Sequence, residues 1–188
     1  RPGDSIQQLE RAIALMPDCA RAYFELGLSR NQFGDTAGAE AAYLNAIRAD
    51  PLFAEALVNL GLIYLLQHGR PERAEALLRR AIALQPHMIE AQANLGLAIQ
   101  EQQRFGEALA HYEQLLAVQP HVDEYRWNRG VLQLGLGEFE TGWEDYETRK
   151  RRGGGIGNRH FPYLEWDGSP LTDSTLLVYA EQGLGDEI

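Results

Sequence analysis

Apolar side chains recur every three or four positions in two neighbouring stretches, Ala54 to Leu66 and Ala74 to Leu84. The polar run Gln67-His68-Gly69-Arg70 separates the two stretches, and Pro86 follows the second. Apolar residues at this spacing fall on one side of a helix, and a short polar run with glycine is typical of a turn. Proline cannot continue a helix, so it marks an end. The pattern therefore predicts two amphipathic helices joined by a short turn.

The same pattern occurs before and after this stretch at a nearly constant interval. Glycines 34, 35 and 34 residues apart follow a Leu, or in the fourth case an Arg, at Gly27, Gly61, Gly96 and Gly130. Prolines with the same intervals close the units at Pro17, Pro51, Pro86 and Pro120. Small residues recur at Ala39, Ala74, Ala108 and Gly142, and large ones follow at Tyr43, Leu78, Tyr112 and Tyr146. We interpret the small residues as points where two helices cross closely and the large residues as the side chains that fill the gaps between crossings.

This period and these residue choices resemble the tetratricopeptide repeat. The resemblance implies an all-α, right-handed superhelix (α-solenoid) of about nine helices over residues 1–152. We assign the second helix of a partial repeat to residues 4–17, full repeats to 20–53, 54–88 and 89–122, and a degenerate repeat to 123–152. The one-residue excess of the second full repeat is expected in its turn, near His68.

Helical patterning stops after Arg152. Residues 153–160 read as a glycine-rich linker, and residues 161–188 contain a short apolar run with strand character, Leu176-Leu177-Val178-Tyr179. The turn Gly183-Leu184-Gly185-Asp186 follows. In this context it resembles the start of a glycosyltransferase-like domain of the bacterial heptosyltransferase type, which implies an irregular or strand-containing tail. The resemblance also implies that Asp186 lies in a sugar-transfer cleft. The rest of such a domain does not follow, so we expect the fragment to be inactive.

Composition and charge narrow the choice of partners. The single cysteine rules out an internal disulfide, no apolar run is long enough for a membrane span, and nothing resembles a signal peptide. We therefore expect a cytoplasmic protein without membrane contact. Its first residue, Arg1, suggests a piece of a longer protein. The net charge of −10 disfavours nucleic-acid binding, which needs clustered cations. The one basic cluster, residues 149–152, fits a solvated helix end or, alternatively, an anion site.

The residue before each Leu-Gly or Arg-Gly pair is the first candidate for ligand binding. It is asparagine in three repeats (Asn59, Asn94 and Asn128) and Glu25 in the first. An amide both donates and accepts hydrogen bonds, so a row of asparagines can hold a peptide backbone of any sequence. The row resembles the asparagine ladder in the repeats of eukaryotic protein O-linked N-acetylglucosamine transferase. The alternative is that each asparagine bonds to its own helix backbone.

The other groove positions are partly apolar and lack a basic clamp. Phe24, Leu62, Leu97 and Trp127 are candidate apolar contacts for a partner, with Trp127 as a candidate anchor or, alternatively, a packing residue of the last repeat. The positions of a cationic clamp are instead held by Glu55, Val58, Glu90, Ala93, Glu124 and Trp127. A partner with an acidic C-terminus is therefore disfavoured by like charge.

The polar residues form no pattern that indicates catalysis or a cofactor. His87 and His121 lie one repeat apart, too far to share a metal ion, and His111 is expected to face solvent on a second helix. No Ser-His-Asp set, carboxylate pair or metal-ligand spacing stands out, so we expect no cofactor, no metal and no enzymatic activity of this chain.

Three hypotheses follow for function. The first is a protein-interaction scaffold that binds an extended peptide or a partner protein in the concave groove of the repeats. The second is the substrate-recruiting arm of a glycosyltransferase. The third is self-association through exposed end helices or through the tail, because a cut array exposes apolar faces.

Overall fold

The computed structural model describes residues 2–150 and the side chains of residues 5–148. The linker expected at 153–160, the domain start expected at 161–188, and Asp186 with its glycine turn lie outside the described residues. The described chain divides at Pro120 into two units, residues 2–120 and 121–150, and each is described by itself.

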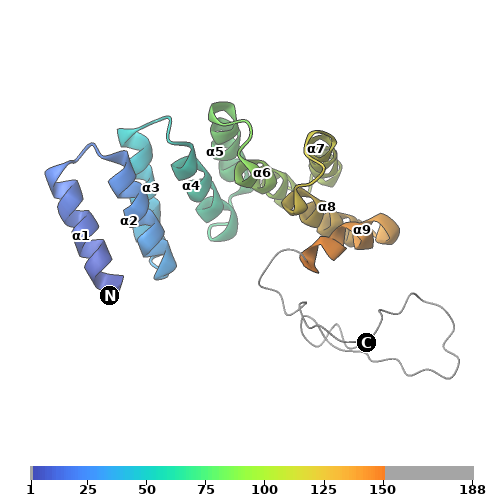
Figure 1. Ribbon diagram of the computed structural model, residues 1–188, viewed down its shortest axis with the longest axis horizontal. Helices are drawn as coiled ribbons and strands as arrows, with labels where there is room; N and C mark the ends of the chain where they lie inside the picture. The colour runs from blue at the N-terminus through green and yellow to red at the C-terminus, as the bar shows by residue number, and fades with distance from the viewer. Residues whose placement is uncertain (1, 151–188) are drawn as a thin grey trace, which may run out of the picture. The chain divides into compact units, whose positions relative to one another are not determined.

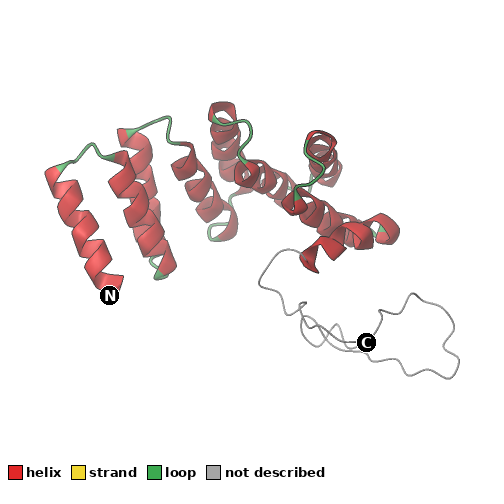
Figure 2. Ribbon diagram, viewed as in Figure 1, coloured by secondary structure: helices red, strands yellow, loops and turns green. Residues whose placement is uncertain are grey.

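The predicted all-α fold is confirmed for residues 2–150, which contain nine α-helices, a short 3-10 helix and no strand (Figure 1, Figure 2). The first unit contains α1 (Pro2–Leu15), α2 (Ala20–Gln32), α3 (Thr36–Ala49), α4 (Ala54–Leu66), α5 (Pro71–Leu84), α6 (Ile89–Glu101) and α7 (Phe105–Val118). The second unit contains α8 (Asp123–Leu136), α9 (Phe139–Tyr146) and the 3-10 helix η1 (Glu147–Lys150).

Short turns join the helices into pairs. Three residues separate α2 from α3 and α6 from α7, and four separate α4 from α5. The extra residue of the second full repeat therefore lies in its turn, as predicted, and the imidazole Nε2 of His68 there is 3.0 Å from Oε2 of Glu40 on α3. Turns this short make the two helices of a pair antiparallel neighbours. Contacts also join consecutive pairs through α3 with α4 and α5 with α6, and α4 packs directly on α6.

Each helix pair of the first unit crosses at its glycine. A Cβ atom added at Gly27 would overlap the ring of Tyr43, and one added at Gly96 would overlap the ring of Tyr112. At Gly61 the partner is Leu78, whose Cγ would be 3.3 Å from the added atom. The predicted interpretation of small and large positions is confirmed here: the glycine makes room for the large side chain that the opposite helix presents.

Apolar packing fills the space between the first two pairs. Phe24, Tyr43, Leu60 and Ile63 are buried together with the small side chains of Ala39, Ala46 and Ala56. The ring of Phe24 lies 5.0 Å from that of Phe53 and 5.9 Å from that of Tyr43, so aromatic contacts join α2, α3 and the start of α4. Burial of this kind is the main stabilising term of a repeat stack.

The second unit keeps the helix pair but changes its contacts. Gly130 packs against Asp145 and Tyr146. Arg129 stands where the other pairs have a buried leucine, and its Nε is 2.5 Å from Oδ2 of the buried Asp145. An ion pair therefore replaces an apolar contact at this crossing. Trp143 is 53% exposed and meets Tyr146 edge to face.

Candidate functional site

The first helices of the second and third full repeats, α4 and α6, present equivalent partly exposed stripes. Asn59 and Leu62 on α4 are half-buried, and so are Asn94 and Leu97 on α6. On α2 the same positions hold Glu25 and Leu28, and Leu28 is 37% exposed. We call these six residues the first-helix face. Because α4 and α6 contact each other directly, the two asparagine-leucine pairs lie on neighbouring helices with the same register.

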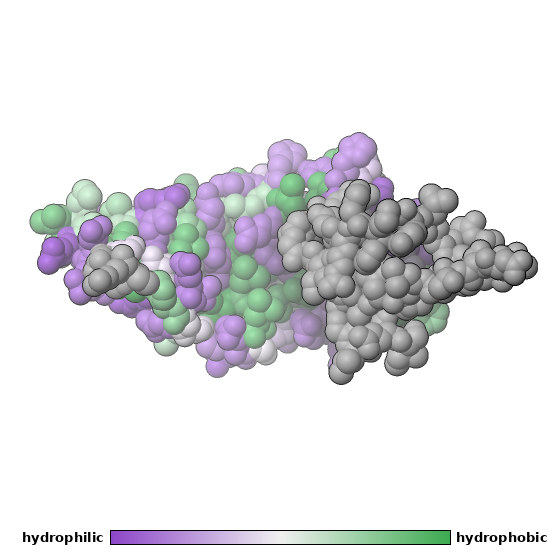
Figure 3. Space-filling model, turned by 60° about the horizontal axis from the view of Figure 1, so that its bottom comes forward, coloured by the Kyte–Doolittle hydropathy of each residue, from purple (hydrophilic) through white to green (hydrophobic). Residues whose placement is uncertain are grey.

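Apolar side chains gather visibly over the middle helices of the first unit. Figure 3 shows them as a green area bordered by polar side chains, in the part of that face that the grey atoms leave uncovered. An apolar area framed by polar residues is typical of a surface that binds another chain.

The two asparagines of the first-helix face, Asn59 and Asn94, differ in their hydrogen bonds. Nδ2 of Asn59 donates to the backbone oxygen of Glu55, 2.9 Å away and one turn earlier on the same helix. The side chain of Asn94 has no hydrogen bond to any of the described residues. Local bonding, the alternative to a ladder, is thus present at Asn59 and absent at Asn94, where both the donor and the acceptor of the amide remain available.

One of the candidate apolar residues, Phe24, does not lie on this face. Phe24 is 6% exposed and belongs to the core, because its position faces α3 rather than solvent. Val58 and Ala93, at the equivalent positions of the next repeats, are buried as well. The expectation that Phe24 contacts a partner therefore conflicts with its burial. The partly exposed row is the one four residues later, Leu28, Leu62 and Leu97.

Asn128 and Trp127 lie on α8, in the second unit. The indole of Trp127 stacks on the ring of Tyr146, with 4.7 Å between centroids and 24° between planes. This contact agrees with the packing alternative for Trp127. Asn128 is half-buried. Since the two units are described separately, the ladder within one unit consists of Asn59 and Asn94.

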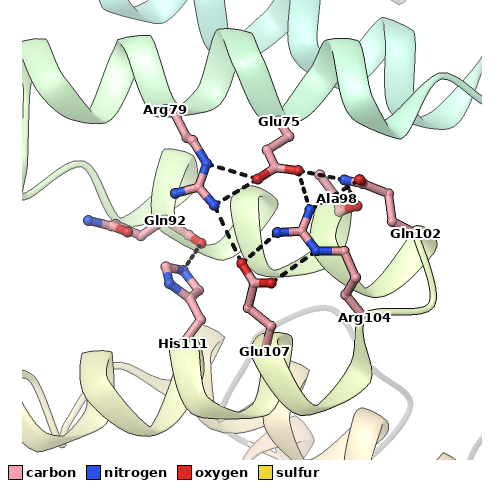
Figure 4. A network of polar contacts seen from close by, with 8 residues as sticks. All are labelled: Glu75, Arg79, Gln92, Ala98, Gln102, Arg104, Glu107 and His111. Atoms are coloured by element: carbon pink, nitrogen blue, oxygen red, sulfur yellow. Dashed lines mark hydrogen bonds and ion pairs between the residues drawn. The ribbon is translucent and has the colours of Figure 1, made fainter.

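A network of polar side chains joins the second and third full helix pairs (Figure 4). Its centre is Glu75 on α5, whose side chain is 14% exposed. Oε2 of Glu75 accepts from Nε2 of Gln102 and from Nη1 of Arg104, both at 2.7 Å. Nε of Arg79 donates to Oε1 of Glu75 at 2.8 Å. Arg104 also contacts both carboxylate oxygens of Glu107 on α7.

The network determines the protonation of Glu75. Burial raises the pKa of its carboxyl, but hydrogen bonds from Gln102, Arg79 and Arg104 together outweigh burial and lower the pKa below its ordinary value. Glu75 therefore stays charged and holds three donors from two repeats. The network could not be predicted from the sequence. Pairs such as Glu75 with Arg79 can be recognised from their i,i+4 spacing, but nothing in the spacing links Glu75 to Arg104.

The prediction that His111 on α7 faces solvent is wrong. The side chain is half-buried, and its Nε2 donates to the backbone oxygen of Gln92, 3.0 Å away. Burial lowers the pKa of the imidazole, and the bond to the Gln92 carbonyl only partly opposes this. The second helix turns this position toward α6, so the side chain packs between helices of one repeat.

The described residues provide no metal centre. No group of three or more histidine, cysteine, aspartate or glutamate side chains there could hold a metal ion. Each described helix is too short or too polar to span a bilayer. The first-helix face is the candidate binding surface within the described part of the chain.

Comparison with known proteins is consistent with this architecture. Family models described as tetratricopeptide repeat match residues 1–51, 32–89 and 65–128, which together cover about two thirds of the chain. Among curated proteins, Protein FlbA of Caulobacter vibrioides is 27% identical over 189 residues, across 100% of this chain and 26% of FlbA. The chain thus spans about a quarter of the length of this relative.

Several solved structures share the fold. MamA from Desulfovibrio magneticus RS-1, residues 41 to the end, has a TM-score of 0.69 at 16% identity, over 81% of this chain and 88% of that one. PilW, a widely conserved type IV pilus biogenesis factor, has a TM-score of 0.68 at 21% identity, over 80% and 71%. YrrB, described as a TPR protein with an unusual peptide-binding site, has a TM-score of 0.61 at 22% identity, over 79% of each chain.

Proposed function

Because the chain belongs to the tetratricopeptide repeat family, we propose that it is a protein-interaction module that holds an extended peptide or partner segment along the first-helix face. The observation that carries the proposal is the state of Asn94. Its amide is half-buried, has no hydrogen bond among the described residues, and lies one turn before the half-buried Leu97. The amide N and O of Asn94 are not among the buried polar atoms that lack a hydrogen-bond partner, so both face solvent, and a peptide backbone could replace water at both of them.

The neighbouring helix supports the same role. Asn59 and Leu62 repeat the arrangement on α4, although Nδ2 of Asn59 is already bonded to Glu55. Its Oδ1 remains an acceptor for a backbone N–H. Half-buried leucines at Leu62 and Leu97 would receive apolar side chains of the bound segment, and burial of those side chains would supply most of the affinity. The description of YrrB as peptide-binding agrees with this use of the fold.

A random dodecapeptide library offered to the immobilised full chain tests the proposal. We expect retention of peptides above the bare support, and loss of that retention in the double variant Leu62→Gln/Leu97→Gln. The matched control is Leu44→Gln, which changes a 40% exposed leucine on the second helix α3. Equal retention by the wild type and the double variant would refute the first-helix face as the binding surface.

A further inference from the structure

Charge is distributed unequally between the first and second helices of the central repeats. The first helices α4 and α6 carry Glu55, Glu90 and Glu101 and contain no lysine, arginine or histidine. The bases lie on the second helices and in the turns, and several of them are engaged: Arg79 and Arg104 hold Glu75, and Arg48 bonds to Asn45. The first helices of the central repeats therefore carry negative charge that no base on the same helix compensates.

Two of these carboxylates extend the first-helix face. Glu55 lies one turn before Asn59, and Glu90 lies one turn before Asn94, so the two occupy the same position in successive repeats. Neither carboxylate contacts a cation among the described residues. Acidic residues in a first turn also favour the helix dipole. That effect explains why glutamate is tolerated there, but it leaves the charge of the face unchanged.

We propose that the segment held on this face belongs to another protein and carries two lysine or arginine residues three positions apart, with apolar residues beside them. The inference rests on the proposed function and specifies its partner. Glu55 and Glu90 would each meet one cation, Leu62 and Leu97 would meet the apolar side chains, and Asn94 would hold the backbone. The glutamate, asparagine and leucine positions of α4 and α6 thus each meet a group of complementary chemistry on the bound segment.

The spacing follows from the geometry of helices and extended chains. Packed helices lie about 8–10 Å apart, which sets the separation of equivalent side chains on α4 and α6. A polyproline II segment advances about 3.1 Å per residue with three residues per turn, so residues i and i+3 point the same way about 9 Å apart. In a β-strand, residues i and i+2 are only about 7 Å apart. The spacing of residues i and i+3 in polyproline II, about 9 Å, matches the helix spacing of about 8–10 Å, which favours a polyproline II segment.

The chain itself is a poor occupant. Residues 161–188 carry six acids and no base, so like charge opposes their binding to this face. The basic run 149–152 of a second copy has the right charge, but three glycines follow it at 153–155. Thr148 precedes this run and Gly153 follows it, so no large apolar residue stands directly beside its bases to meet Leu62 and Leu97. Neither of these two segments of residues 1–188 fits the face well, which agrees with a partner protein as the occupant.

The test compares the library selection between charge variants. The double variant Glu55→Gln/Glu90→Gln removes both carboxylates from the face. Its matched control, Glu72→Gln/Glu113→Gln, removes the same net charge from exposed positions on the second helices α5 and α7. For wild type and control we expect peptides with basic residues at i and i+3 to be enriched roughly three- to tenfold over the input, as expected for two exposed charge pairs. We expect this enrichment to vanish in the face variant and to weaken with salt.

Three outcomes separate the inference from the proposed function. Retained peptides without excess basic residues, or equal enrichment by wild type and face variant, would overturn the inference and leave the proposed function intact. Retention of no peptide would overturn both. Sedimentation of the chain alone adds a further arm: a dimer that Glu55→Gln/Glu90→Gln dissociates would overturn the assignment to another protein, whereas a concentration-independent mass supports it.

Discussion

Arg104 in the turn between α6 and α7 holds Glu75 of α5, with 2.7 Å between Nη1 of the guanidinium and Oε2 of the carboxylate. The same guanidinium contacts Glu107 at the start of α7. One side chain thus connects two consecutive repeats through residues 29 positions apart. Most contacts between repeats are apolar, so this network adds a directional, charge-assisted joint to a stack otherwise held by packing.

Glu75→Ala is expected to lower the free energy of unfolding by about 1–3 kcal/mol, because Gln102, Arg79 and Arg104 lose a shared, largely buried acceptor. Urea denaturation followed by circular dichroism measures the change. Glu72→Ala, at an exposed position of the same helix, is the control and should stay within about 0.5 kcal/mol of wild type. Equal effects of the two substitutions would show that the network does not stabilise the repeats.

The contribution of Glu75 should depend on pH. Its folded-state pKa lies below the ordinary value of 4.5, so its charge stabilises the fold fully above pH 4.5. As pH falls from 4.5 through the folded-state pKa, the carboxylate takes up a proton and that stabilisation is lost. The difference in unfolding free energy between wild type and Glu75→Gln should therefore be constant from pH 7 to 5 and shrink below 4.5. A difference that grows on acidification would contradict this assignment.

The glycines at the helix crossings should respond differently to substitution by alanine. Gly96→Ala drives a methyl group into the ring of Tyr112, and we expect a loss of about 1–3 kcal/mol. Gly61→Ala places its methyl group 3.3 Å from Cγ of Leu78. This milder overlap is relieved by a small movement of the leucine, so the loss of stability should be smaller. Gly106→Ala meets nothing within 4 Å and should stabilise α7 by up to about 1 kcal/mol. Thermal unfolding of the three variants checks the order.

Asn94→Ala should weaken the binding of a peptide selected from the library by about 1–3 kcal/mol, because backbone groups of the peptide lose their partner. Asn59→Ala should have a smaller effect, since Nδ2 of Asn59 already bonds to Glu55. Isothermal titration with one selected peptide measures both. Unchanged affinity of the Asn94 variant, with its unfolding curve intact, would remove Asn94 from the binding surface.

His111 should titrate below the ordinary value of 6.5, because burial disfavours the charged imidazole. Its neutral form then stabilises the fold above pH 6.5, and this contribution is lost as pH falls through the lowered pKa. Nuclear magnetic resonance titration of the imidazole C–H signals gives the midpoint directly, and His111→Gln identifies the signal. A midpoint at or above 6.5 would mean that the side chain is solvated instead.

Much of the fold could be predicted from the sequence because the same residue pattern occurs in every repeat. Gly27, Gly61 and Gly96 each mark a crossing, and Pro51 and Pro86 each mark a boundary between pairs. Period and small-residue positions depend on backbone geometry, which is the same in every repeat. The placement of individual side chains was less predictable. Phe24 belongs to the core because the core face of α2 is wider than the Leu-Gly signature indicates.

The polar contacts could not be predicted from the sequence, for a different reason. The reach of Arg104 to Glu75 depends on how far the α6–α7 turn leans over the preceding repeat, and no periodic pattern encodes that. His111 was misplaced because its helix face was inferred from polarity, whereas a carbonyl of α6 offers it an acceptor. The division of the chain at residues 1–152, 153–160 and 161–188 stays a prediction, as does the glycosyltransferase-like start that includes Asp186.

The network around Glu75 also determines which helices of the first unit should unfold last. Repeats that touch only their neighbours unravel piece by piece rather than all at once. Amides of α5, which carries Glu75, and of α6, which packs against α5, should exchange with deuterium more slowly than those of the end helix α1, which packs mainly on α2. A partner bound to α4 and α6 would therefore contact the slowly exchanging region of the unit, and the end helix α1 could unfold locally without releasing it.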